Sequence, residues 1–154
     1  MTKETAIAGP AVLLVIGYGN ELRRDDGVGP KVAAAVAEWN SAGVRALACH
    51  QLTPELAEPI ASAGQVVFVD AAADSAGEVQ LRQLDPIASA EVMTHSTDPR
   101  WLLGLAKQVF GRCPSAWSLT IPTENLGFGE ELSSLARQGM QTALERIRIL
   151  ASSP

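Results

Sequence analysis

The sequence predicts an α/β fold, a three-layer sandwich in which a mostly parallel sheet of about five strands lies between helices. One observation leads to this prediction. Helical patterns alternate along the chain with four short apolar runs, at residues 12–16, 44–48, 66–69 and 116–121. Such alternation is typical of strand–helix–strand units, and right-handed connections between parallel strands place helices on both faces of the sheet.

A fifth strand is predicted at one edge of the sheet. Residues 78–84 alternate between apolar and polar side chains, and only the loop 72–77 separates them from the preceding strand. A connection this short cannot hold a crossover helix. We therefore expect this strand to be antiparallel to its neighbour.

Capping signals mark the expected helices. Thr53 and Asp98 each precede a proline and can cap a helix that begins there, and Gly111 is suited to end the second of these helices. Pro59 falls inside the first of them, so that helix should be short, kinked or begin later. The last helix is indicated by an apolar stripe at helical spacing, formed by Leu132, Leu135, Ala136, Met140, Ala143, Leu144 and Ile147.

Composition limits the classes of function. The 154 residues suit one domain spanning 1–154, with residues 1–10 and 151–154 expected to be disordered. A net charge of −5 without a basic cluster argues against nucleic acid or an anionic membrane as partner. No apolar run approaches the ~20 residues that span a bilayer, and the first ten residues lack a signal-peptide core. We therefore expect a cytoplasmic protein.

The two cysteines, Cys49 and Cys113, lie far apart in the sequence and lack metal-binding spacing. This spacing excludes a structural zinc knot, and a reducing compartment disfavours a disulfide between them. We expect both to be small core residues.

A polar loop follows the first predicted strand. Residues 17–29 read Gly-Tyr-Gly-Asn-Glu-Leu-Arg-Arg-Asp-Asp-Gly-Val-Gly, and they stand at the carboxyl end of a parallel strand, where open α/β sheets bind ligands. The loop does not match a dinucleotide fingerprint, because Leu22 occupies the position of the third glycine and Ala37 that of the acidic residue. Asp25 and Asp26 would also repel a phosphate, which disfavours a nucleotide-binding regulatory domain.

The expected topology gathers distant polar residues at one edge of the sheet. Asp26 follows the first strand, His50 follows the second and Asp70 ends the third, while residues 122–124 follow the last. All of these positions lie at the carboxyl edge if the strands are parallel. His95 comes just before a helix that feeds a parallel strand, and such a helix must start at the same edge.

Asp26, Asp70 and His95 form a donor set of two carboxylates and one imidazole, which suits Zn²⁺, Ni²⁺ or Mn²⁺. Simpler interpretations remain open: Asp70 can cap a turn, Asp26 or Asp25 can cap the first helix, and a loop histidine can be incidental. A serine or cysteine hydrolase is less well supported, because the sequence has neither a Gly-x-Ser-x-Gly elbow nor a Cys/His signature.

Four segments together resemble the nickel–iron hydrogenase maturation proteases over nearly the whole chain. They are residues 17–29, Val-Asp-Ala-Ala at 69–72, Met-Thr-His-Ser at 93–96 and Ile-Pro-Thr-Glu at 121–124. The resemblance implies a twisted sheet between helices. It also implies an endopeptidase that removes the C-terminal peptide of a hydrogenase large-subunit precursor after nickel insertion. The family's metal-recognition residues correspond to Asp26, Asp70 and His95, the trio that topology gathers.

The resemblance further implies that nickel arrives with the precursor, that the precursor is the partner, and that no organic cofactor is needed. We expect a monomer. Residues 50–55, His-Gln-Leu-Thr-Pro-Glu, replace an Asp-Gly-Gly-Thr-like turn of many relatives and resemble the subgroup that serves NAD-reducing, bidirectional hydrogenases. Candidate accessory residues are His50, Asn20, Asp25 and Thr53. The alternative function is a non-catalytic chaperone of the same fold that senses nickel or binds the precursor.

Overall fold

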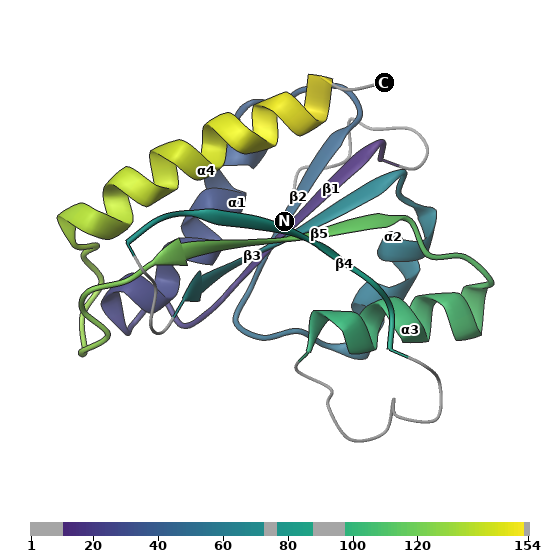
Figure 1. Ribbon diagram of the computed structural model, residues 1–154, viewed down its shortest axis with the longest axis horizontal. Coiled ribbons are helices and arrows are strands. Elements are labelled where there is room, and N and C mark those ends of the chain that lie inside the picture. Colours follow the sequence, from purple (N-terminus) through teal and green to yellow (C-terminus); the bar gives the residue numbers. More distant parts are fainter. Residues whose placement is uncertain (1–10, 73–76, 88–97, 153–154) are drawn as a thin grey trace.

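The computed structural model describes residues 11–72, 77–87 and 98–152. These residues form a five-stranded sheet with the strand order β2-β1-β3-β5-β4 (Figure 1). The parallel strands are β1 (Leu13–Tyr18), β2 (Val44–Cys49), β3 (Gln65–Ala72) and β5 (Ser115–Pro122). At the edge, β4 (Gln80–Leu84) pairs with β5 in the antiparallel sense. The predicted fold class and the antiparallel edge strand are both confirmed.

Helices cover both faces of the sheet (Figure 1). One face is covered by α1 (Val28–Glu38) and α4 (Ser134–Ser152), and the other by α2 (Ala57–Ser62) and α3 (Pro99–Phe110). In β1, Leu13 and Val15 pack in the core beneath α1 and α4, whereas Leu14 and Ile16 pack in the core beneath α2 and α3. Residues 13–16 of β1 are all apolar, as expected for a strand that is buried on both faces.

The α-helix expected after Thr53 begins later than Pro54, which is one of the outcomes predicted from Pro59. A 3-10 turn, η3 (Pro54–Leu56), precedes α2, so Pro59 falls in the first turn of α2, where backbone N–H groups have no partner within the helix. Thr53 takes the cap position of η3, but the prediction of a side-chain cap was wrong. Its hydroxyl group bonds to the Glu55 carboxylate, which is a charged acceptor two residues away.

The boundaries of α3 are those predicted. The Asp98 carboxylate accepts a hydrogen bond of 2.9 Å from the backbone N–H of Arg100, and Gly111 ends the helix with φ of +81°. By contrast, the predicted disorder from residue 151 was wrong for Ala151 and Ser152, which continue α4. Ala151 packs against the apolar core under α4, and the Ser152 hydroxyl donates a hydrogen bond to the Arg148 carbonyl.

No helix in the described part of the chain combines the length and the apolar character that crossing a membrane requires. The longest of these helices, α4, is amphipathic: Ala136, Ala143 and Ile147 are buried, and the exposed positions between them include charged residues. Its apolar side packs into the core of this domain.

The start of α1 packs very closely against the sheet. A Cβ atom on Gly29 would lie 2.5 Å from the Val69 carbonyl oxygen and 2.6 Å from that of Tyr18, and one on Gly17 would collide with the Gly29 carbonyl. Any side chain at Gly17 or Gly29 would therefore push the helix away from the strands. This close approach places the loop of residues 19–27 at the carboxyl ends of β1 and β3.

Candidate active site

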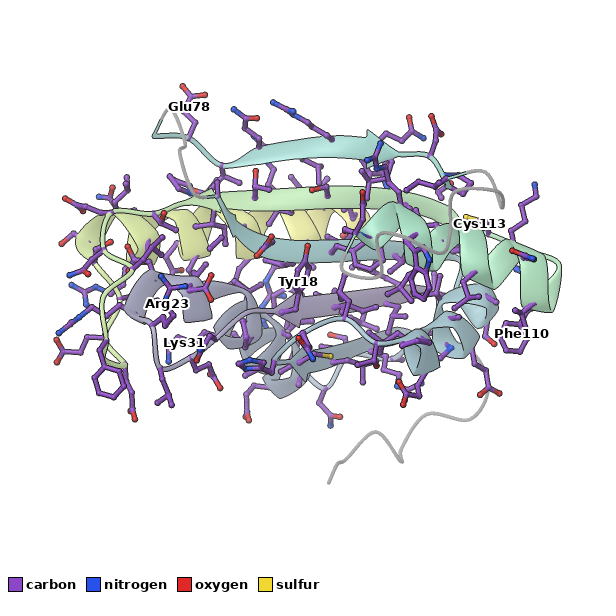
Figure 2. All side chains as sticks on the ribbon, turned by 90° about the horizontal axis from the view of Figure 1, so that it is seen from below. Tyr18, Arg23, Lys31, Glu78, Phe110 and Cys113 are labelled. Atoms are coloured by element: carbon purple, nitrogen blue, oxygen red, sulfur yellow. The ribbon has the colours of Figure 1, made fainter. Side chains whose placement is uncertain are left out.

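Tyr18 and Asp70 are neighbours at the carboxyl edge of the sheet. The β1–β3 ladder ends at the pair Gly17–Val69, so the next residues of the two strands stand side by side. The Tyr18 hydroxyl donates a hydrogen bond to the Asp70 carboxylate. In Figure 2, Tyr18 lies near the middle of the view, with Arg23 and Lys31 from the following loop and helix to its left.

The surroundings of Asp70 favour its protonated form. Burial raises the pKa of Asp70 from 3.8 to about 6; hydrogen bonds from the Ala71 N–H and the Tyr18 hydroxyl oppose the rise, and the charge of Asp26 adds to it. The Ala71 N–H lies 2.8 Å from Oδ1. A carboxyl group with this pKa can exchange a proton near neutral pH, as a general acid or base must.

Tyr18 remains a hydrogen-bond donor at any physiological pH. Burial raises the pKa of its hydroxyl well above 10, and the negative charge of Asp70, the hydrogen bond to it and the charge of Asp98 raise it further. Sequence reasoning missed this residue. The relevant signal was its place as the last residue of a strand, but the β1–β3 register was needed to pair it with Asp70.

Asp26 lies in a 3-10 turn, η2 (Arg24–Gly27), within the loop after β1, and is partly exposed. Its Oδ2 accepts a hydrogen bond of 2.9 Å from the backbone N–H of Asn20. The Asn20 side chain, in turn, accepts a hydrogen bond of 2.9 Å from the N–H of Leu22. Asn20 therefore shapes the loop and orients Asp26, and its accessory role stays a prediction.

The alternative interpretation that Asp25 or Asp26 caps α1 was wrong. Gly27 takes the cap position, and no side chain bonds to the first turn. Asp25 is instead fully buried, and its carboxylate bonds to the loop between β5 and α4. Burial raises the pKa of Asp25, but hydrogen bonds from Ser133, Glu124 and Asn125 outweigh this effect and hold the pKa below its usual value. Asp25 thus holds the loop beside the site in place, and its own side chain is not exposed in the site.

His50 lies beside the same loop. It helps to line a cleft of about 490 Å³ together with Asn20, Glu21, Leu22, Lys31 and Glu130. The loop is also tied to β2, because the Gly19 N–H donates a hydrogen bond of 3.1 Å to the Cys49 carbonyl. The structure therefore brings His50 and Asn20 together, while Thr53 is bonded to Glu55.

The two cysteines are not activated nucleophiles. Burial raises the pKa of both the Cys49 and the Cys113 thiol. A thiol with a raised pKa contains little of the reactive thiolate form at neutral pH. Figure 2 also shows Cys113 at the far end of the molecule from Arg23 and its loop.

Asp26 and Asp70 both lie at the predicted edge, close enough for the charge of Asp26 to raise the pKa of Asp70. His95 lies outside the described residues, so the predicted trio stays a prediction. Within residues 11–72, 77–87 and 98–152, no three His, Cys, Asp or Glu side chains are grouped to hold a metal ion. Carboxylate oxygens are suitable ligands for divalent metal ions, so Asp26 and Asp70 fit a metal site that further ligands complete.

No protein-family model matches the chain, and no curated protein matches it in sequence. Several solved structures share its fold. A [NiFe] hydrogenase maturation protease, HycI from Thermococcus kodakarensis, is 24% identical with a TM-score of 0.71 over 95% of this chain and 96% of that one. HybD from the same organism is 24% identical (TM-score 0.67; 91% and 99% covered), and the endopeptidase HybD from E. coli is 20% identical (0.65; 88% of each). The chain therefore has the fold seen in these hydrogenase maturation proteases.

Proposed function

We propose that this protein is an endopeptidase that removes the C-terminal peptide of a nickel–iron hydrogenase large-subunit precursor after nickel has been inserted. The observation that carries the proposal is the placement of Asp26 and Asp70 at one edge of the sheet, where the charge of Asp26 raises the pKa of Asp70, in a fold shared with proteases of this kind. The four sequence segments that resemble the family support it independently, because three of them contain Asp26, Asp70 and His95.

In this proposal, Asp26, Asp70 and His95 recognise nickel that the precursor already holds through its cysteines. A divalent ion bound there can polarise the scissile carbonyl group or lower the pKa of a water molecule. The chain itself supplies two carboxylates held in different ways. The Asn20 N–H orients Asp26, and the Tyr18 hydroxyl and Ala71 N–H orient Asp70. When Asp70 is not engaged with the metal, its carboxylate can take a proton from water near neutral pH.

We further propose that the protein belongs with the proteases that serve NAD-reducing, bidirectional hydrogenases. Residues 50–55 support this assignment, and His50 lines the cleft beside the loop that carries Asp26. In that position His50 can contact the precursor or assist a proton transfer. The proposal also includes a cytoplasmic monomer that needs no organic cofactor and receives its nickel from the precursor.

The direct test mixes the protein with nickel-loaded and nickel-free large-subunit precursor and follows the precursor's mass. We expect the nickel-loaded precursor to lose its C-terminal peptide and the nickel-free precursor to stay intact. If the protein binds the nickel-loaded precursor tightly but never shortens it, the non-catalytic chaperone is the correct function. Equal cleavage of both precursors would remove nickel recognition from the proposal.

A further inference from the structure

Asp25 joins two loops that are far apart in the sequence. Its Oδ2 accepts hydrogen bonds from the N–H groups of Glu124 (2.8 Å) and Asn125 (3.0 Å) and from the Ser133 hydroxyl (2.6 Å). Its Oδ1 accepts a bond of 2.7 Å from the Ser133 N–H. We call this set of residues, Asp25 with Glu124, Asn125 and Ser133, the clamp.

The backbone reinforces the clamp along the same two loops. The Asp25 N–H donates to the Asn125 carbonyl at 3.0 Å, and the Arg24 N–H donates to the Gly129 carbonyl at 2.8 Å. Arg24 has φ of +45°, a left-handed conformation that is unfavourable for a residue with a side chain. A loop held in such a conformation depends on the bonds around it.

Ser133 links the clamp to α4. Its hydroxyl oxygen accepts a hydrogen bond of 3.1 Å from the Ala136 N–H at the start of the helix, while the same hydroxyl donates to Asp25. The clamp thus fastens the loop after β1 to the first turn of a long helix packed on the sheet. A rigid helix is a firm anchor for a loop that carries a functional side chain.

The two loops that the clamp joins border the candidate site. Asp26 follows Asp25 directly, and the cleft beside it is lined by Leu22 from the first loop and Glu130 from the second. Loss of the clamp would remove its side-chain bonds between these two loops and leave their backbone hydrogen bonds. Asp25 itself has no exposed surface and so cannot contact a substrate.

We propose that Asp25 is a positioning residue: its buried carboxylate fixes Asp26 and the cleft by joining the loop after β1 to the loop before α4. This role deepens the proposed function and rests on it for its catalytic consequence. The effect of Asp25 on the position of Asp26 and the cleft concerns the free protein alone. It can therefore be tested without a precursor.

The first test measures amide hydrogen exchange of the free protein in wild type and Asp25→Asn. Asparagine offers one acceptor oxygen in place of two and turns an NH₂ group toward N–H donors. The Asn20 amide bonds to Asp26 and not to Asp25. We expect its exchange to become about tenfold faster, because the clamp loses hydrogen bonds to a charged acceptor and the loop that carries Asp26 opens more often. Unchanged protection at Asn20, alongside faster exchange at Glu124 and Asn125, would overturn the positioning role.

Two controls separate positioning from general loss of stability. Ile147→Val shortens a fully buried side chain of α4 away from the clamp, and should leave the Asn20 amide protected relative to the core amides. Ser133→Ala removes one donor to Asp25, and Ser133→Thr restores the hydroxyl. We expect partial loss at Asn20 with alanine and recovery with threonine, which keeps the test open if Asp25→Asn fails to fold.

The second test follows cleavage of nickel-loaded precursor by the same variants. We expect Asp25→Asn to lower kcat/KM about tenfold, because it misplaces Asp26, which recognises the nickel of the precursor, whereas Ile147→Val should keep the wild-type kcat/KM. If the wild type does not cleave, the proposed function fails while the exchange result still decides the geometry. A wild-type kcat/KM in a folded Asp25→Asn variant would refute the catalytic consequence.

Discussion

Replacing Asp70 by asparagine should stabilise the protein at neutral pH while removing its activity. The folded-state pKa of Asp70 is about 6, above the ordinary 3.8, mainly because burial disfavours the charged carboxylate. Folding therefore favours the protonated form. The contribution of this group to stability is complete below pH ~4 and is lost as the pH rises through about 6.

The size of the effect follows from the two pKa values. Their separation corresponds to about 3 kcal/mol, which is an upper bound because Asp70 keeps some contact with solvent. Asparagine carries no charge to desolvate, and its oxygen can still accept the Ala71 N–H. We expect Asp70→Asn to raise the free energy of unfolding at pH 7 by about 1 to 3 kcal/mol, and by much less at pH 4.

Urea denaturation of both proteins at a series of pH values measures this difference. Asp25→Asn is the matched control, because the pKa of Asp25 lies below its usual value and its carboxylate stabilises the fold. That contribution is present above the ordinary pKa of aspartate and is lost as the pH falls through the lower folded-state value, so Asp25→Asn should destabilise at pH 7. An Asp70→Asn variant that is less stable than wild type at pH 7, or whose advantage is independent of pH, would refute the reasoning.

Three further predictions concern the candidate site. Tyr18→Phe removes a donor to the Asp70 carboxylate, so the pKa of Asp70 should rise above 6; carboxyl NMR titration measures it, and a fall would contradict the assigned hydrogen bond. His95→Ala should abolish cleavage of nickel-loaded precursor with a native circular dichroism spectrum; normal cleavage would remove His95 from the site. Thiol reagents that leave the fold intact should not inhibit, because burial raises the pKa of Cys49 and Cys113; full inhibition would favour a cysteine nucleophile.

The overall architecture was predictable because its signals are local. Apolar runs, a proline at position 59 and the Asp98–Gly111 capping pair each depend on neighbours a few residues away. The placement of Asp26 and Asp70 at one edge followed from strand direction alone. Capping was not predictable for Thr53 and Asp25, because their side chains form hydrogen bonds with other partners instead.

The sequence by itself thus determined the layers, the strand directions and the edge at which the polar residues meet. Only the tertiary structure decided which of these residues bond to one another. Tyr18 meets Asp70 through strand register, and Asp25 meets Ser133 across 108 residues of chain. The reason is physical: periodicity and capping act over a few residues, whereas such bonds form only after burial has brought distant loops together. Burial favours the protonated form of both Asp70 and Asp25, and only the larger number of hydrogen-bond donors around Asp25 reverses this preference there.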